Sequence, residues 1–188
     1  MASAEEIAAA RNALSSGDLM GALKQCKGLL GKDPKSYDAL LIAGEACCQL
    51  LAQQPSRGAE EGGKKGPDWS SEAEKALVKA SEADPLRVEA WEQLQMLAMQ
   101  LENREKETDA MAGLAVAQRA SSIPSWASLL AETAARQEQE GRHALAASSH
   151  AEIASNPSSP PDQKARSLSE QARILLAANL PSATDTAK

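Results

Sequence analysis

The sequence predicts an all-α protein built from consecutive helical hairpins, and three observations support this. About one residue in five is alanine, while aromatic residues make up only 2% of the 188 residues. Alanine and leucine favour helices, whereas strands are enriched in β-branched and aromatic residues. No run of Val and Ile is long enough to form a buried parallel strand. Glycine- and proline-containing breaks divide the chain into helical segments that come in pairs.

The breaks define the helical segments in chain order. Ser15-Ser16-Gly17-Asp18 ends the first segment, and Gly31 to Pro34 ends the second. Ser70 and Ser71 are suitable N-caps for the fourth segment. The expected helices span residues 5–14, 19–30, 37–53, 70–84, 87–103, 105–121, 125–140, 142–155 and 162–179.

Two further segments lack a helical pattern. Residues 53–69 are rich in Gly and Pro and carry charges of both signs, which predicts a disordered surface loop inserted between two helices. Residues 180–188 form a polar tail that we also expect to be disordered. The segment before this tail, 162–179, has a helical apolar stripe that predicts a capping helix: Ala165, Leu168, Ala172, Leu175 and Leu176.

Four prolines at the ends of helical segments reveal a repeat. Pro34, Pro85, Pro124 and Pro157 are separated by 51, 39 and 33 residues. The first spacing exceeds 34 by the length of the 17-residue insert at 53–69. A period of 34 residues with two helices per unit is typical of helical repeat arrays.

The pattern resembles the tetratricopeptide-repeat (TPR) family, in which small and large residues recur at fixed positions of each hairpin. The matching residues include Ala10, Ala22, Pro34, Leu40, Ala43, Gly44, Ala73, Leu77, Ala80, Pro85, Trp91 and Leu94. The resemblance implies an α-solenoid of about four hairpins over residues 3–157, with 162–179 as its cap. A fourth unit, which begins with Trp126, follows the pattern weakly.

A narrower resemblance concerns the first repeats. Residues 22–30, followed by Tyr37 and Gly44, are similar to the N-terminal repeats of the TPR scaffold subunits of Superkiller complexes. This resemblance implies a subunit of a cytoplasmic RNA-decay assembly.

The composition argues against several kinds of chemistry. The net charge of −6 disfavours direct nucleic-acid binding, which needs a clustered basic surface. Cys26 and Cys47 fall at buried repeat positions, where free cysteine acts as a small apolar residue. His143 and His150 have no further ligand or carboxylate at catalytic spacing, so His150 is interpreted as a packing residue and His143 as a capping or surface residue. We therefore expect no enzyme activity, no cofactor, no metal, no small-molecule substrate and no membrane span. Three cysteines form no disulfide framework, which predicts the cytoplasm, with the nucleus as an alternative.

The family resemblance places partner-binding residues on the first helix of each hairpin. These positions predict a mixed apolar and acidic groove formed by Arg11, Leu41, Ile42, Glu45, Glu92, Gln93, Met96 and Met99. Such a groove would bind a peptide or helix with apolar anchors and some Lys or Arg. The leading hypothesis is a non-catalytic scaffold or adaptor. The alternatives are the RNA-decay subunit and a helical accessory domain of an enzyme, and Leu41, Ile42 and Met96 are alternatively packing residues.

Overall fold

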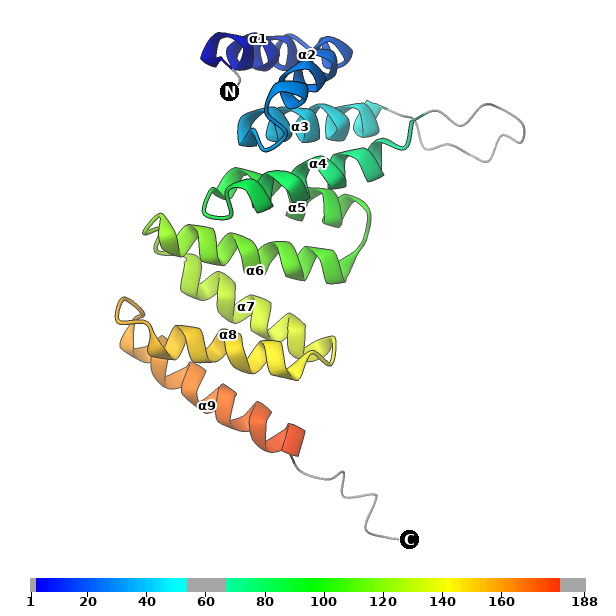
Figure 1. Ribbon diagram of the computed structural model, residues 1–188. Coiled ribbons are helices and arrows are strands. Elements are labelled where there is room, and N and C mark those ends of the chain that lie inside the picture. The colour runs from blue at the N-terminus through cyan, green and yellow to red at the C-terminus, as the bar shows by residue number, and fades with distance from the viewer. Residues whose placement is uncertain (1–2, 54–66, 180–188) are drawn as a thin grey trace, which may run out of the picture. The chain divides into compact units, whose positions relative to one another are not determined.

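A computed structural model describes residues 3–53 and 67–179 of the chain (Figure 1). All regular secondary structure in this part of the chain is α-helical, which confirms the predicted fold class. The helices are α1 (Ala4–Ser15), α2 (Leu19–Lys32), α3 (Tyr37–Gln53), α4 (Trp69–Ala83), α5 (Val88–Gln100), α6 (Arg104–Ala120), α7 (Trp126–Gln139), α8 (His143–Ser155) and α9 (Pro161–Asn179). Most of the loop predicted over 53–69, and the predicted tail, lie outside the described residues.

The chain divides into two compact units, residues 1–103 and 104–188. The boundary falls between α5 and α6, the helices that correspond to the predicted segments 87–103 and 105–121. The single repeat domain over 3–157 and the capping role of 162–179 stay predictions.

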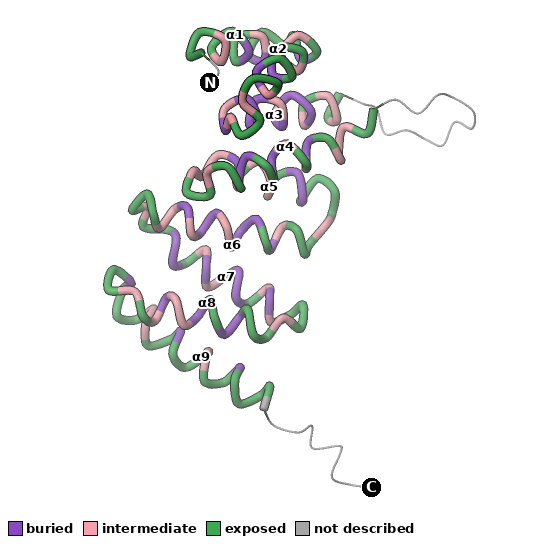
Figure 2. The backbone as a smooth tube through the Cα atoms, viewed as in Figure 1, coloured by how far each residue is buried: buried purple, intermediate pink, exposed green. Residues whose placement is uncertain are grey.

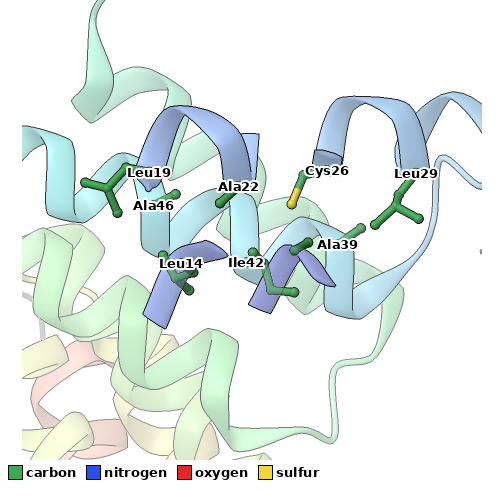
Figure 3. Packing of buried hydrophobic residues seen from close by; sticks show 9 residues of the cluster. Leu14, Leu19, Ala22, Cys26, Leu29, Ala39, Ile42 and Ala46 are labelled. Atoms are coloured by element: carbon green, nitrogen blue, oxygen red, sulfur yellow. The ribbon is translucent and has the colours of Figure 1, made fainter. Parts of the chain in front are cut away.

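In the first unit, every helix packs against the next one along the chain, and α3 also contacts α1 and α5. Two clusters of buried apolar side chains result. One lies between α1, α2 and α3 and includes Leu14, Ala22 and Ile42 (Figure 3). The other joins α3 to α4 and α5 and includes Leu41 and Leu77. Helix α3 is therefore the centre of this unit, with buried positions along much of its length (Figure 2).

The contact between α3 and α4 depends on a glycine. A Cβ atom at Gly44 would lie 2.5 Å from Cδ2 and 2.6 Å from Cγ of Leu77, whose side chain is fully buried. The predicted small residue of the repeat pattern thus corresponds to a close approach of two helices. Gly28 on α2 has no neighbour that a Cβ atom would meet.

Turns of two kinds recur between the helices. In the first kind, one residue adopts a positive φ after a helix: Gly17, Glu102, Ser122 and Gly141. At Gly17 the amide donates to the Leu14 carbonyl, and the next amide, of Asp18, donates to the Ala13 carbonyl, as in a Schellman motif.

The second kind is an Asx-Pro turn, which ends α2, α4 and α8. Asp33 and Asp84 have nearly identical backbone angles (φ −142° and ψ 90°; φ −144° and ψ 89°), and each is followed by proline. The Asp33 and Asp84 carboxylates and the Asn156 side-chain carbonyl each accept from the amide two residues further on. Because proline lacks an amide proton, the helix cannot continue. The prolines predicted to end hairpins therefore do so at Pro34, Pro85 and Pro157.

The start of α4 differs from the prediction. Its N-cap is Asp68, whose Oδ1 accepts from the amide of Ser71 at 3.3 Å and from the Ser70 hydroxyl at 2.6 Å. The carboxylate, rather than a serine hydroxyl, caps the helix, and α4 begins at Trp69.

In the second unit, α6, α7, α8 and α9 each pack against the next helix. Buried apolar side chains gather around Trp126, Leu130 and Ile153, and a smaller cluster contains Ala146 and Ile174. Ion pairs add cross-links between helices: Arg119 with Glu152, Arg136 with Glu107 at 2.6 Å, and the turn residue Arg142 with Asp109 at 2.5 Å.

Helix α9 presents a different face to its unit than predicted. Leu168, Leu175 and Leu176 are 56%, 45% and 64% exposed, whereas Ser167 and Ile174 are buried. The predicted leucine stripe is thus rotated away from the core by about one residue, or about 100° of helix. Polar contacts made by α9 hold it in this orientation: Arg173 donates to both carboxylate oxygens of Glu138 on α7.

Candidate functional site

The predicted partner-binding residues come from α1, α3 and α5, which pack side by side through α1–α3 and α3–α5 contacts. The N-terminal ends of α3 and α5 lie together, since the Tyr37 hydroxyl accepts a hydrogen bond from the Ala90 amide at 3.2 Å. All eight predicted residues belong to the first unit.

Leu41 and Ile42 do not line an accessible groove. They are 1% and 0% exposed and belong to the two core clusters on either side of α3. Their positions were predicted to face a partner because the family resemblance places partner-binding residues on the first helix of each hairpin. In this unit, α3 is covered by α1 and α2 on one side and by α4 and α5 on the other, so both side chains are used in packing.

The other six predicted residues are exposed or half-buried. Met96 and Met99 are 61% and 56% exposed. Arg11 and Glu92 are also exposed, whereas Glu45 and Gln93 are half-buried. We call the following set the α1/α3/α5 face: Arg11, Glu45, Glu92, Gln93, Met96 and Met99.

A network of charged groups at the start of α3 and α5 borders this face. Arg87 Nη1 lies 3.1 Å from Asp38 Oδ1, and Arg87 Nη2 lies 3.1 Å from Glu89 Oε1. The Arg87 guanidinium also lies 3.9 Å from the centroid of the Tyr37 ring, in a cation–π contact. Arg11 lies at 3.9 Å from Asp38 and connects α1 to the network.

The electrostatics of this network follow from its contacts. The hydrogen bond from Arg87 holds the pKa of Glu89 below its ordinary value. Burial raises the pKa of Tyr37 to about 12, so the hydroxyl remains protonated and donates to Glu89 Oε2 at 3.3 Å. These charges fix the relative positions of the helices that carry the α1/α3/α5 face. The network could not be predicted from the sequence, because Asp38 and Arg87 lie 49 residues apart.

Glu45 is the half-buried carboxylate of the face. Burial raises its pKa, while the charge of Arg11 lowers it and the charge of Glu89 raises it further. Within the described chain, Glu45 makes no ion pair within 4 Å. A cationic side chain from a partner would therefore meet a carboxylate that this protein has not neutralised by a direct contact.

The cysteines take the role expected of core residues. Cys26 and Cys47 are buried, as predicted, and Cys48 is half-buried. Burial raises the pKa of each of the three thiols to about 11, so they are protonated and weakly nucleophilic at neutral pH. Among the described residues, no group of three or more His, Cys, Asp and Glu is arranged to hold a metal ion.

The two histidines also lie as predicted, with His143 exposed and His150 8% exposed. Burial lowers the pKa of His150 below its ordinary 6.5, an effect opposed by Glu170 and Glu138 and reinforced by Arg173. The folded protein therefore favours neutral His150, and the unfolded chain takes up the proton more readily.

We expect the free energy of unfolding to fall as the pH decreases from about 6.5 through the lower pKa that His150 has in the folded protein. The reason is that in this pH range the unfolded chain binds the proton more readily than the folded one. Urea unfolding midpoints measured at pH 7 and just below pH 6 test this. His150→Gln should reduce the pH dependence in this window, whereas the exposed His143→Gln should retain it. If the unfolding midpoint changed equally with pH in wild type and in His150→Gln, then His150 would not be the source of this pH dependence.

None of the described helices is both long and apolar enough to cross a bilayer. Within each of the two units, every described helix packs against the next one along the chain in an all-α architecture.

Comparisons with known proteins give the following results. No protein-family model matches the sequence, and no curated protein matches it. Among solved structures, the chain is similar to MamA, with 18% identity over 77% of this chain and 67% of that chain and a TM-score of 0.47. It is also similar to TTC0263, a thermophilic TPR protein of Thermus thermophilus, with 21% identity over 89% and 78% of the two chains and a TM-score of 0.48.

A further similar structure is that of YrrB, described as a TPR protein with an unusual peptide-binding site. Its identity is 14% over 93% of this chain and 91% of that chain, with a TM-score of 0.43. None of these similarities assigns a residue or an activity to this chain.

Proposed function

We propose that this protein is a non-catalytic interaction module whose α1/α3/α5 face binds a peptide or helix of a protein partner. The observation that carries the proposal is the exposure of Met96 and Met99 on α5. Helix α5 packs against α3, the helix that carries Glu45. Methionine is flexible and polarizable, and it suits surfaces that adapt to a partner. The exposed thioethers lie on the same helix as Glu89 of the charge network, so α5 can offer both apolar contact and charge to a partner.

The partner's chemistry follows from the charges of the face. Its ionisable residues are Glu45, Glu92 and Arg11, and Arg11 already lies near Asp38. Glu45 is half-buried and lacks an ion pair in the described chain, so it favours a partner Lys or Arg. We therefore propose a partner segment with apolar anchors against Met96 and Met99 and a basic residue opposite Glu45.

Replacing Met96 and Met99 together by Asp should weaken binding of such segments at least about tenfold, or about 1.4 kcal/mol, because two apolar anchors become charged. Peptides selected on the wild-type chain from a displayed random library, followed by isothermal titration calorimetry, provide the measurement. The selected peptides should combine apolar residues with Lys or Arg.

Met20→Asp on α2 is the matched control, because Met20 is 59% exposed in the same unit but lies outside the face. Equal loss of binding in Met20→Asp and in the double variant, or selected peptides without apolar residues, would argue against this site.

The Superkiller-type alternative places the same module in a cytoplasmic RNA-decay assembly and rests on the sequence resemblance of residues 22–44. It predicts co-purification of the tagged chain with an RNA helicase. Recovery of other stable partners without a helicase would reject that pathway and leave the interaction-module proposal in place.

A further inference from the structure

A cleft in the second unit is lined by residues of α7, α8 and α9. Its volume is about 590 Å³, within the range of about 300–1,000 Å³ that is usual for ligand pockets. We call it the α7/α9 cleft, and the residues that matter for its chemistry are Ala131, Ala135, His150, Ile153, Arg166 and Glu170.

Polar contacts hold the two walls together at the two ends of the cleft. At one end, Gln163 Nε2 donates to Ser128 Oγ at 3.1 Å. At the other, Arg173 donates to both oxygens of Glu138, at 2.8 and 2.6 Å, and to Glu170 at 2.7 Å. Between these contacts the α7 wall carries the small side chains of Ala131 and Ala135, so the middle of the cleft stays open.

Polar groups around the cleft are left without partners. His150 is buried, with an exposed fraction of 8%. Its Nδ1 atom has no hydrogen-bond partner within the described chain. The buried Gln163 Oε1 is likewise unpaired. A buried polar atom without a hydrogen-bond partner lowers the stability of the fold, so these two atoms are an energetic cost in this part of the unit.

The charges of the cleft are unequal along its length. Arg173 is held between Glu138 and Glu170, so the end containing these three groups carries a net negative charge. Arg166 also lines the cleft, is exposed, and makes no ion pair with any described residue. Its guanidinium is thus available to a carboxylate that enters the cleft.

We propose that the α7/α9 cleft binds an extended peptide segment of a protein partner that carries an Asp or Glu side chain opposite Arg166. The wall from Ser128 to Glu138 is about 15 Å long at 1.5 Å per helical residue. An extended peptide covers this length with about four or five residues at 3.3 Å each. A carboxylate forms strong, bidentate contacts with arginine, and an Asp or Glu side chain opposite Arg166 would supply one.

This inference rests on the proposed function as a protein-binding module, but it concerns a separate surface with the opposite charge preference. The α1/α3/α5 face favours a basic segment, whereas the α7/α9 cleft favours an acidic one. A partner could be recognised at either site alone.

The test uses capped degenerate peptide pools of this length, one with Glu fixed at the central position and one with Lys there. Chemical shifts of the Ala131 and Ala135 methyl groups and of the His150 ring are followed in the full chain by NMR. The Glu pool should shift these signals and the Lys pool should not. Arg166→Glu should weaken binding of the Glu pool at least about tenfold. Arg104→Glu, an exposed charge reversal on α6 outside the cleft, should leave it unchanged.

Ala135→Leu separates binding from folding, because a larger apolar side chain at this exposed position fills the cleft without changing charge. This variant should abolish the Glu-pool shifts and keep the unfolding midpoint of the wild type. Equal binding of both pools, unchanged binding in Arg166→Glu, or no shift with either pool would overturn the inference. The Met96→Asp/Met99→Asp chain should still bind the Glu pool, so failure of the α1/α3/α5 face and failure of the cleft are distinguishable.

Discussion

Ile42→Ala should lower the free energy of unfolding by about 2–5 kcal/mol, because it leaves a cavity in the core between α1, α2 and α3. Ile42 has no exposed surface in the structure, so its methyl and methylene groups are fully lost from packing contacts. The free energy is measured by urea unfolding monitored by circular dichroism. Ile42→Asp should have a still larger effect, since it buries an unpaired carboxylate.

The matched comparison is Met96→Asp, which changes a residue of the same predicted groove that is 61% exposed. Its effect on the free energy of unfolding should stay within about 0.5 kcal/mol. If Ile42→Ala were as stable as Met96→Asp, then Ile42 would not be a core residue. In that case Ile42 could contact a partner, as the sequence predicted.

The second large effect is expected at Gly44. Gly44→Ala places a Cβ atom within 2.6 Å of two carbon atoms of Leu77, whose fully buried side chain has little room to move. Helices α3 and α4 must then separate or Leu77 must leave its rotamer, and such overpacking costs about 1–3 kcal/mol. The unfolding midpoint in urea should decrease.

Gly28→Ala is the same chemical change but should raise the unfolding midpoint instead of lowering it. A Cβ atom at Gly28 meets no other group, and replacing glycine by alanine within a helix gains about 0.5–1 kcal/mol. The two substitutions should therefore move the midpoint in opposite directions. A stabilising Gly44→Ala would show that α3 and α4 do not approach as closely as the structure indicates.

Much of the fold could be predicted from local sequence signals. Asp33-Pro34 and Asp84-Pro85 end helices through groups that lie within three residues of each other, so the prolines identified the hairpin ends. Gly17 and Gly141 adopt the positive φ that glycine tolerates best, at turns between helices. Such signals act over one turn of chain and need no knowledge of tertiary packing.

The candidate sites were harder to predict because they depend on which helices surround a given one. Leu41 and Ile42 were assigned to a groove because the family resemblance places partner-binding residues on first helices, whereas α3 is covered on both sides. The Asp38–Arg87–Glu89 network joins residues on either side of the 53–69 insert. The α7/α9 cleft arises where small side chains of α7 face α9 in the part of the chain with the weakest repeat pattern.

The central claim is that the α1/α3/α5 face contacts a partner, and site-specific photo-crosslinking tests it most directly. A photoreactive residue is placed at Met96 in one sample and at Met20 in another, both in the full chain, and each is illuminated in native extract. We predict a defined adduct from position 96 that disappears when Glu45→Arg is added, and no such adduct from position 20. The same adduct from both positions, or none from position 96, would contradict the account.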